Sequence, residues 1–348
     1  MCFLSLTVAG QGQGMDIEDK NDSAFFQLIR FKFLHLTDKD GNKSNIPFSG
    51  VNIIDARFDT LSVGFNHPGA LVPYEELSFD QPLSAVIQNY ITRSYNLLPV
   101  TDSTSKLLIV LDKYWITSSI VKDTSIAGSF QEGILIKANI LAERNGGYYP
   151  LYTVDTMYTK LQLNADNETA LLENGIDKML TRIINKSQSE LKISRRKLAY
   201  DDITAYVNDR FAIPILGTTL YKKGIYKTFQ EFTNNNPSIT NYEIVYKGRT
   251  DVLRGEEEGG PMHIIKNAWG FCDGTNLYIC SSDNFFLLCQ EGKSFEINGF
   301  KSFTYVTNLN VLMLMAPIRL IYIPIYFGGH LKDKKVPLQI DMETGELF

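Results

Sequence analysis

The pattern of apolar and polar residues along the chain predicts a protein that mixes strands and helices. The stretch from Phe25 to Leu36 is apolar and alternates at Arg30-Phe31-Lys32-Phe33, which is typical of a strand. Val51 to Asp59 reads as a second strand with a polar end. From Leu83 to about Leu98, apolar residues recur at three-and-four spacing, so we expect an amphipathic helix there, with Asp80 as its N-cap.

Further strands and a second helix follow in the first half. The apolar strand candidates are Leu107 to Ile116, Phe130 to Arg144 and Leu151 to Leu163, with a hairpin turn at Gly146-Gly147. The helix is expected from Asn167 to near Glu190, because apolar residues again line one face. Residues 15–190 therefore predict a two-layer α+β domain, in which two helices pack on an antiparallel or mixed sheet.

The second half has a different pattern. Residues 191–215 are expected to connect two domains, and 216–348 to form a mainly β domain. A short helix is expected from Thr228 to Asn234, and turn residues such as Asp273-Gly274 recur about every ten residues, which favours a β-meander. The last residues are expected to form a hairpin that turns at Glu343-Thr344-Gly345.

The N-terminus has the pattern of an export signal. Residues 2–9 form a short apolar run, and small and polar residues follow it, so we expect a signal segment at 1–14 with cleavage near Val8-Ala9-Gly10. A buried first strand is the alternative reading. The sequence thus predicts an exported protein of the periplasm or outer cell envelope.

Charge and composition exclude one class of partner. The chain of 348 residues has a formal net charge of −5, and its charged residues are spread along its length. A nucleic-acid binder normally has a basic face or arm, so we expect no nucleic-acid partner.

The sequence shows little sign of a catalytic site. The chain lacks a nucleophile elbow, a phosphate loop and a dinucleotide fingerprint, so we expect no catalytic residue and no cofactor. Asp55, Arg57 and Asp59 alternate along the expected strand and would share one face. Such a cluster fits either a binding site or a structural ion pair at a strand end.

The cysteines do not indicate a metal site or a disulfide. His263, Cys272, Cys280 and Cys289 are spaced nine, eight and nine residues apart, whereas structural zinc sites pair ligands two to four residues apart. If Asp273–Asn276 is a four-residue loop, Cys272 faces Leu277 and Cys280 faces Trp269, so no two cysteines are opposed. We expect buried free thiols and no metal.

The longest apolar run lies near the C-terminus, at residues 311–327. Its length approaches that of a membrane-spanning helix, but Arg319 would cost about 2.5–3.5 kcal/mol at the bilayer centre. Tyr322 and Tyr326 resemble residues of a membrane interface. The alternatives are a buried core segment, a membrane contact through these residues, and a surface that binds a partner.

Two parts of the chain resemble known groups. The strand, loop and helix from Val51 to Leu98, with Asp55-Ala56-Arg57 and Gly64, resemble the opening of small YajG-like and transport-auxiliary envelope lipoproteins. That resemblance implies an α+β fold in the cell envelope without catalysis.

Residues 217–348 resemble exported proteins of Bacteroidota-type bacteria whose activity is unknown. The motifs are Gly224-Ile225-Tyr226-Lys227-Thr228-Phe229-Gln230-Glu231-Phe232, Asn236-Pro237-Ser238, Trp269-Gly270-Phe271-Cys272-Asp273-Gly274 with Tyr278, and Asp341-Met342-Glu343-Thr344-Gly345-Glu346. This resemblance implies a compartment and an architecture, but no activity.

The sequence therefore predicts a non-catalytic envelope protein that binds or assembles with an envelope protein, a surface polymer or the membrane. Trp269 and Tyr278 are the candidate contact residues of the meander, although a position in the core is the favoured reading for Trp269. One alternative is an extracytoplasmic hydrolase with a carboxylate site at Asp55 and Asp59. Another is a membrane-anchored subunit that uses residues 311–327.

Overall fold

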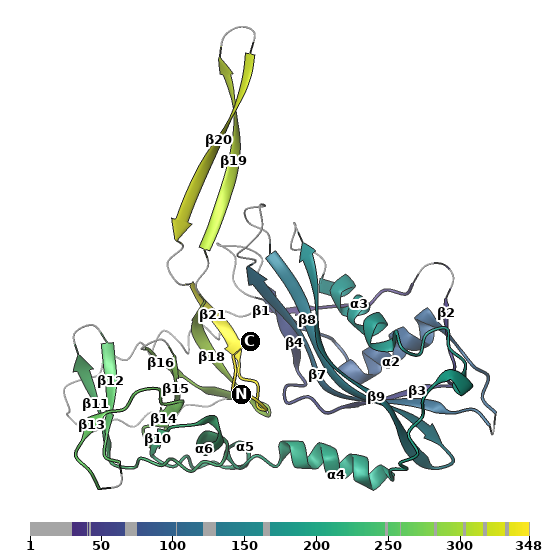
Figure 1. Ribbon diagram of the computed structural model, residues 1–348, viewed down its shortest axis with the longest axis horizontal. Coiled ribbons are helices and arrows are strands. Elements are labelled where there is room, and N and C mark those ends of the chain that lie inside the picture. The colour runs from purple at the N-terminus through teal and green to yellow at the C-terminus, as the bar shows by residue number, and fades with distance from the viewer. Residues whose placement is uncertain are drawn as a thin grey trace.

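The fold is a mixed α+β arrangement, as the sequence predicts (Figure 1). The computed structural model describes residues 30–39, 41, 43–66, 75–101, 103–120, 130–162, 168–247, 250–257, 259–281, 284–301, 304–315, 319–330 and 334–347. The expected signal segment at 1–14 lies outside these residues. Strands gather in two groups, and a long hairpin rises from the second group (Figure 1).

A seven-stranded mixed sheet forms the first group. Its order is β1-β5-β4-β7-β8-β9, and β3 also pairs with β7 in parallel. The strands are β1 (Arg30–Phe33), β3 (Val51–Asp55), β4 (Ser62–Asn66), β5 (Glu75–Ser78), β7 (Lys106–Ile120), β8 (Phe130–Arg144) and β9 (Gly147–Gln162). The first predicted strand is thus shorter than expected within the described residues, and β1 lies at the edge of the sheet.

Strand β7 is buried on both faces. Leu107, Ile109 and Leu111 join the main hydrophobic core, whereas Leu108 and Val110 face the opposite side. This division follows from the two-residue period of a strand. Helices α2 (Leu83–Ser94) and α3 (Glu168–Leu180) cover the first face, and α4 (Tyr200–Phe211) packs on the second.

Helix α2 confirms the predicted amphipathic pattern but not its bounds. It begins at Leu83 after Pro82, so Asp80 is not the N-cap. It ends at Ser94, because Tyr95 becomes extended and starts β6 (Tyr95–Leu97). Strand β6 pairs in parallel with β2 (Ser44–Ile46), and these backbone hydrogen bonds replace those of a longer helix.

The second predicted helix also ends early. Asn167 lies outside the described residues, and α3 stops at Leu180 instead of Glu190. Asn185 then adopts φ 60°, and its backbone N–H donates to the carbonyl of Asn45 at 2.8 Å. A short 3₁₀ helix, η1 (Gln188–Glu190), follows.

The hairpin between β8 and β9 is confirmed, with its turn one residue earlier than expected. The two loop residues are Asn145 and Gly146, which have φ 50° and 64°. Positive φ at both positions is the requirement of a type I′ turn, which Asn-Gly meets at low cost.

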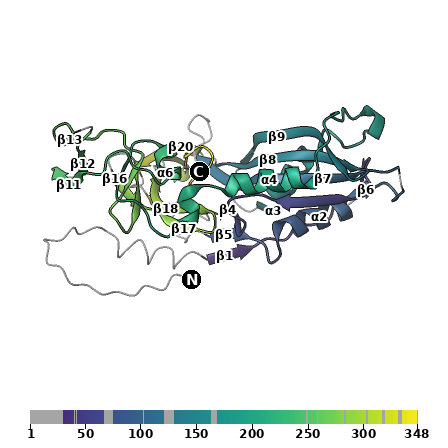
Figure 2. The ribbon, with the colours of Figure 1, turned by 90° about the horizontal axis from the view of Figure 1, so that it is seen from below.

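The expected connection, residues 191–215, contains regular structure. It holds α4 and the start of α5 (Pro214–Gly217), which run between the two groups of strands (Figure 2). Helix α4 packs on the sheet through Ile203, its one fully buried residue.

The second group is built from short antiparallel strands. A four-stranded sheet has the order β10-β14-β15-β16, and two three-stranded sheets have the orders β11-β12-β13 and β17-β18-β21. The elements are β10 (Gly224–Tyr226), α6 (Phe229–Thr233), β11 (Tyr242–Lys247), β12 (Thr250–Gly255), β13 (His263–Ile264), β14 (Gly270–Cys272), β15 (Leu277–Ser281), β16 (Asn284–Leu287), β17 (Cys289–Glu291), β18 (Ser294–Lys301) and β21 (Lys334–Gln339).

Several local predictions for this half are confirmed. Thr228 caps α6 by accepting a hydrogen bond from the N–H of Glu231. Cys272 lies opposite Leu277, and the N–H of Cys280 donates to the carbonyl of Trp269. The C-terminal hairpin closes with a bridge between Ile340 and Leu347.

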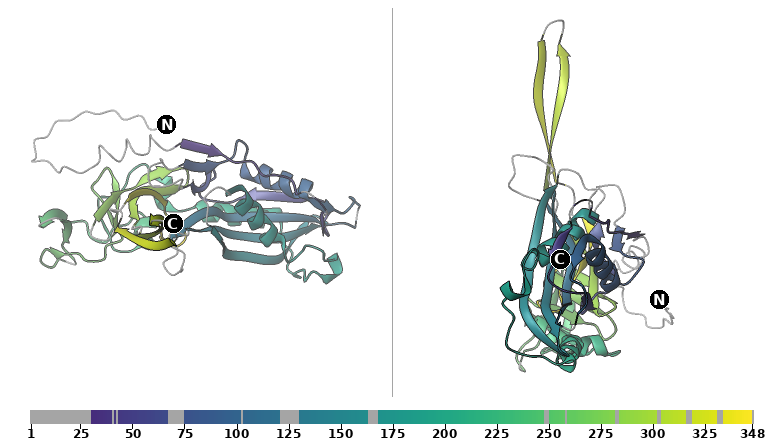
Figure 3. Two further views of the ribbon diagram at one scale, coloured as in Figure 1. Left: turned by 90° about the horizontal axis from the view of Figure 1, so that it is seen from above. Right: turned by 90° about the vertical axis from the view of Figure 1, so that its right-hand side faces the viewer.

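The apolar run at 311–327 falls on a hairpin of two long strands, β19 (Thr304–Met315) and β20 (Arg319–His330). These strands pair with each other from Thr304↔His330 to Met315↔Arg319 and form a two-stranded sheet. The hairpin projects away from the rest of the molecule (Figures 1 and 3). It continues the pair β18–β21, whose last opposed residues are Lys301 and Lys334.

The close approach of β4 to β7 generates a stability prediction. Gly64 has φ 142°, and a Cβ there would lie 2.6 Å from the carbonyl oxygen of Ile116. We expect Gly64→Ala to lower the free energy of unfolding by at least about 2 kcal/mol, measured by urea denaturation. Gly41→Ala is the control, because Gly41 also has positive φ but open space around it, and should cost about 1 kcal/mol. Equal losses would show that the contact with β7 is unimportant.

Candidate functional site

Asp55 and Arg57 form an ion pair at the end of β3. The Arg57 Nε lies 2.9 Å from Asp55 Oδ1, and Nη2 donates to Asp55 Oδ2 at 3.0 Å. Arg57 Nη1 also donates to the carbonyl of Ser62 at 2.6 Å, and Arg57 is only 3% exposed. All three guanidinium nitrogens thus bind within the same connection, which favours the structural ion pair over a ligand site.

Asp59 also forms hydrogen bonds to other groups of the protein. Its carboxylate accepts hydrogen bonds from the N–H of Leu61, from the N–H and Oγ of Ser62, and from Gln339 Nε2 at 2.9 Å. The predicted common strand face is wrong, because β3 ends at Asp55 and Arg57 folds back onto it. Asp59 instead joins the β3–β4 connection to β21.

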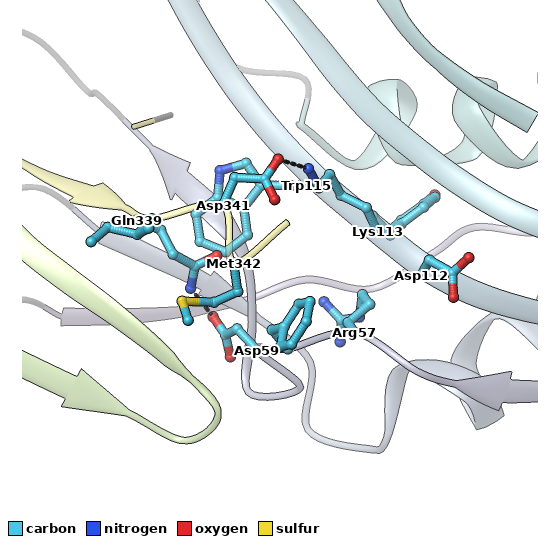
Figure 4. Close-up of a pocket in the computed structure, with 11 residues that line it drawn as sticks. Arg57, Asp59, Asp112, Lys113, Trp115, Gln339, Asp341 and Met342 are labelled. Atoms are coloured by element: carbon cyan, nitrogen blue, oxygen red, sulfur yellow. Dashed lines mark hydrogen bonds and ion pairs between the residues drawn. The ribbon is translucent and has the colours of Figure 1, made fainter. Parts of the chain in front are cut away.

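A small cavity lies beside these residues (Figure 4). Its volume is about 30 Å³, which is room for one or two water molecules. Asp59 and Arg57 line it, but Asp55 does not. The cleft that a hydrolase would need around both carboxylates is therefore not formed by this cavity.

Next to the cavity, Asp112 of β7 anchors a buried polar network. Its side chain has no exposed surface and lies 3.5 Å from Arg210 Nε of α4. Tyr206 Oη and Asn139 Nδ2 donate to Asp112 Oδ2 at 2.8 and 3.0 Å. Burial raises the pKa of Asp112, and Arg210 and Tyr206 oppose this shift.

The C-terminal turn docks on the same network. Asp341 pairs with Lys113 of β7, and Glu343 pairs with Lys137 of β8 and with Arg210 (Figure 4 shows the Asp341–Lys113 pair). Burial would raise the pKa of Glu343, but its hydrogen bond from Lys137 and the charge of Arg210 outweigh it, so the pKa is lowered. Three cations from three elements thus hold the last turn of the chain against the first sheet.

A second polar cluster lies where β18 meets the first sheet. Glu296 is 6% exposed, and its Oε1 is buried without a hydrogen-bond partner. Burial, together with the charges of Glu76, Asp59 and Glu291, raises the pKa of Glu296 to about 8. Burial and the charges of Asp59 and Glu291 raise the pKa of Glu76 to about 7.

A larger groove runs beneath α4. Its volume is about 560 Å³, which is within the usual range of ligand sites, about 300–1,000 Å³. The sheet forms its floor, and α4 and the segment before it form its sides. Its lining includes Val110, Asn139, Thr153, Lys197, Ile203 and Tyr206.

The predicted aromatic contact residues belong to the core of the second half. Tyr278 is 3% exposed and stacks on Phe271 at 4.7 Å, so the expectation of an exposed contact is wrong for it. Trp269 is half-buried and packs on Phe232 at 4.2 Å. Both rings are held by neighbouring strands and α6, because this small half needs its aromatic residues for its core.

The other predicted contact residues lie in β20. Arg319 opposes Met315, Tyr322 opposes Leu312, and Tyr326 opposes Asn308. They therefore lie on the projecting hairpin.

The three cysteines of the second half are free thiols. Cys272 is buried, whereas Cys280 and Cys289 are partly exposed, so the expected full burial is confirmed only for Cys272. Burial raises the pKa of Cys280 to about 12, which makes it a poor nucleophile at neutral pH. Cys289 lies opposite Glu296 because β17 pairs with β18.

Two absences hold for the part of the chain that the structure describes. No group of three or more His, Cys, Asp or Glu side chains there is arranged to hold a metal ion. No helix there has the length and apolar character needed to cross a membrane.

Comparison with known proteins leaves the family open. No family model matches the chain, and no curated protein matches it. Among solved structures, protein XCC0632 from Xanthomonas campestris, of family DUF330, is 11% identical with a TM-score of 0.23, over 44% of this chain and 90% of that one. Another, described as an uncharacterized protein, is 12% identical with a TM-score of 0.27, over 44% and 96%. At these TM-scores neither similarity supports a conclusion about this chain.

The network around Glu343 generates the second prediction. We expect Glu343→Gln to lower the free energy of unfolding by about 1–2 kcal/mol, because Arg210 and Lys137 lose a shared charged partner. Since the pKa of Glu343 is lowered in the folded state, this stabilisation is complete above pH 4.5 and is lost as the pH falls further. Glu346→Gln, at an exposed position of the same turn, should change stability by less than about 0.5 kcal/mol. Chemical denaturation at pH 7 and pH 3 compares the two, and similar effects would contradict the docking role.

Proposed function

We propose that this chain is a non-catalytic binding or assembly protein of the bacterial cell envelope. Its β19–β20 hairpin would contact an envelope protein or a surface polymer. The observation that carries the proposal is the projection of this long hairpin beyond both groups of strands (Figure 3). An isolated two-stranded hairpin is only marginally stable in water, so a contact with another molecule would stabilise it.

The hairpin's sequence supports the same role. Four consecutive opposed pairs are apolar, from Val311↔Ile323 to Leu314↔Leu320. Neighbouring pairs alternate between the two faces of a hairpin, so apolar positions occur on both faces. A run of apolar residues at these positions favours a contact with another protein or a membrane.

Membrane contact through residues 311–327 is the second candidate function. The same run of apolar pairs favours it. In this case the chain would be a membrane-anchored subunit of an envelope complex.

The groove beneath α4 is a second place for a ligand. Its volume of about 560 Å³ would accommodate a small molecule or a peptide segment.

We propose export to the periplasm or outer envelope on the N-terminal sequence alone.

The proposal assigns a different role to each predicted domain. We propose an α+β domain at 15–190, a connection at 191–215 and a mainly β domain at 216–348. Separate hydrophobic cores support it, one shared by the first sheet with α2 and α3 and others shared by the strands of the second half. The first domain would serve as a base, and the second would carry the hairpin.

Replacing the hairpin tests the function. Lys301 and Lys334 are directly opposed, so an Asn-Gly turn in place of residues 302–333 would close β18 and β21 without strain. We expect the shortened protein to keep its melting temperature within about 5 °C but to leave the envelope fraction, assayed by fractionation of a bacterial host that makes the protein. Leu220→Ser, at a residue that is 79% exposed elsewhere, is the control and should fractionate as the full chain does.

The outcomes separate the candidates. Retention of the full chain after a carbonate wash would favour membrane contact, whereas release would favour a protein or polymer partner. An unprocessed full chain among soluble cytosolic proteins, or a shortened chain that stays in the envelope, would contradict the proposal.

A further inference from the structure

Strands β18 and β21 precede and follow the hairpin in the chain, and they contact the first half of the molecule at Asp59. These two strands pair along Glu296↔Gln339 to Lys301↔Lys334 and then continue into β19 and β20. The end remote from the hairpin carries Glu296 and Gln339, and Gln339 Nε2 donates to Asp59 Oδ2 at 2.9 Å.

The contact concentrates carboxyl groups. Glu296 comes from β18 and Glu291 from β17, while Asp59 and Glu76 come from the first sheet and its β3–β4 connection. Within the described residues, none of these four groups pairs with a Lys, Arg or His side chain within 4.0 Å. Arg57 cannot neutralise them, because it is bound to Asp55 and to the carbonyl of Ser62.

Asp59 is held in this cluster by several hydrogen-bond donors. It accepts hydrogen bonds from two backbone N–H groups, from Ser62 Oγ and from Gln339. Hydrogen bonds to a carboxylate favour its charged form. A neighbouring carboxyl group must then either keep its proton or add a second negative charge to a poorly solvated place.

Glu296 is the group that keeps the proton. Its side chain is buried, and Oε1 has no donor to stabilise a negative charge. The hydrogen bond from Gln339 opposes this effect of burial only in part. The neutral acid avoids the cost of a buried charge and can donate its own O–H.

We propose that a proton held on Glu296 closes the contact between β18–β21 and the first sheet, and that its loss above neutral pH loosens this contact and frees the β19–β20 hairpin to change its orientation. The consequence for the hairpin rests on the function proposed above. The proton-dependent contact itself rests only on the cluster.

The direction of the pH effect follows from linkage. The pKa of Glu296 is raised to about 8 and that of Glu76 to about 7, both above their ordinary value of 4.5. The folded contact therefore binds more protons than the open one, and it is strongest below pH 4.5 and weakens as the pH rises to 8.

Hydrogen exchange of the backbone amides tests the contact. We expect amides of β4, β5, β18 and β21 in the full-length protein to exchange at least about tenfold faster at pH 8.5 than at pH 6, after correction for the intrinsic rate. In Glu296→Gln, whose side chain is neutral at both pH values, this ratio should fall clearly below that of the unchanged protein, and the pH dependence that remains should come from Glu76. Glu346→Gln is the matched control and should behave as the unchanged protein.

Infrared spectroscopy gives a second readout on the unchanged protein, which applies even if Glu296→Gln fails to fold. A carbonyl band of a protonated carboxylic acid should persist above pH 6 and disappear with a midpoint near pH 8. Loss of all such bands below pH 6, or an exchange ratio in Glu296→Gln equal to that of the unchanged protein, would overturn the proposal.

The orientation of the hairpin is measured separately by energy transfer between two dyes. The dyes are attached to non-natural amino acids that replace Asn308 on the hairpin and Val100 on the first half, and Val100 is 78% exposed. A shift in transfer between pH 6 and pH 8.5 that is lost in Glu296→Gln supports the coupling. Faster exchange without such a shift would support the proton-dependent contact but would contradict the proposed effect of this contact on the hairpin. Failure of envelope binding with both pH effects intact would overturn only the proposed function.

Discussion

Strand β7 is buried on both faces and pairs with strands on both edges, and most of the structure is arranged around it. Its Leu107, Ile109 and Leu111 face α2 and α3, while Leu108 and Val110 face α4. The middle of this strand, from Leu107 to Asp112, is buried on both faces, so a charge there must find partners inside the protein. Asp112 is such a charge, and it binds Arg210, Tyr206 and Asn139.

The same requirement ties distant parts of the chain together. Arg210 also pairs with Glu343, and Asp341 pairs with Lys113, so the C-terminal turn is bound to the first sheet by opposite charges. The neighbouring contact of β21, at Gln339, has the opposite character, because Glu296, Glu76 and Asp59 are all acidic. One contact is thus held by ion pairs, whereas we propose that the other depends on protonation.

Local patterns predicted the pieces that local forces decide. The apolar period identified α2, and Asn145-Gly146 formed a tight turn because both residues accept positive φ. The register of Cys272 and Cys280 was right, since a four-residue loop at Asp273–Asn276 fixes which residues face each other, whereas Cys289 lies opposite Glu296 and not opposite Asn276 as expected. The face shared by Asp55, Arg57 and Asp59 was wrong, because Arg57 found its partner by folding back onto Asp55. A two-residue period assigns residues to faces only as long as the strand continues. It does not show where a side-chain interaction ends the strand.

The sequence alone determined the strand and helix candidates, the α+β class and the apolar run at 311–327, because each depends on the order of neighbouring residues. Only the tertiary structure decided that this run forms a projecting hairpin and that Glu343 meets Arg210, 133 residues apart in the chain. Only the fold could reveal Glu296 as a buried acid beside Asp59 and Glu76. Burial and charge pairing across such separations depend on how strands are brought together, and no short stretch of sequence carries that information.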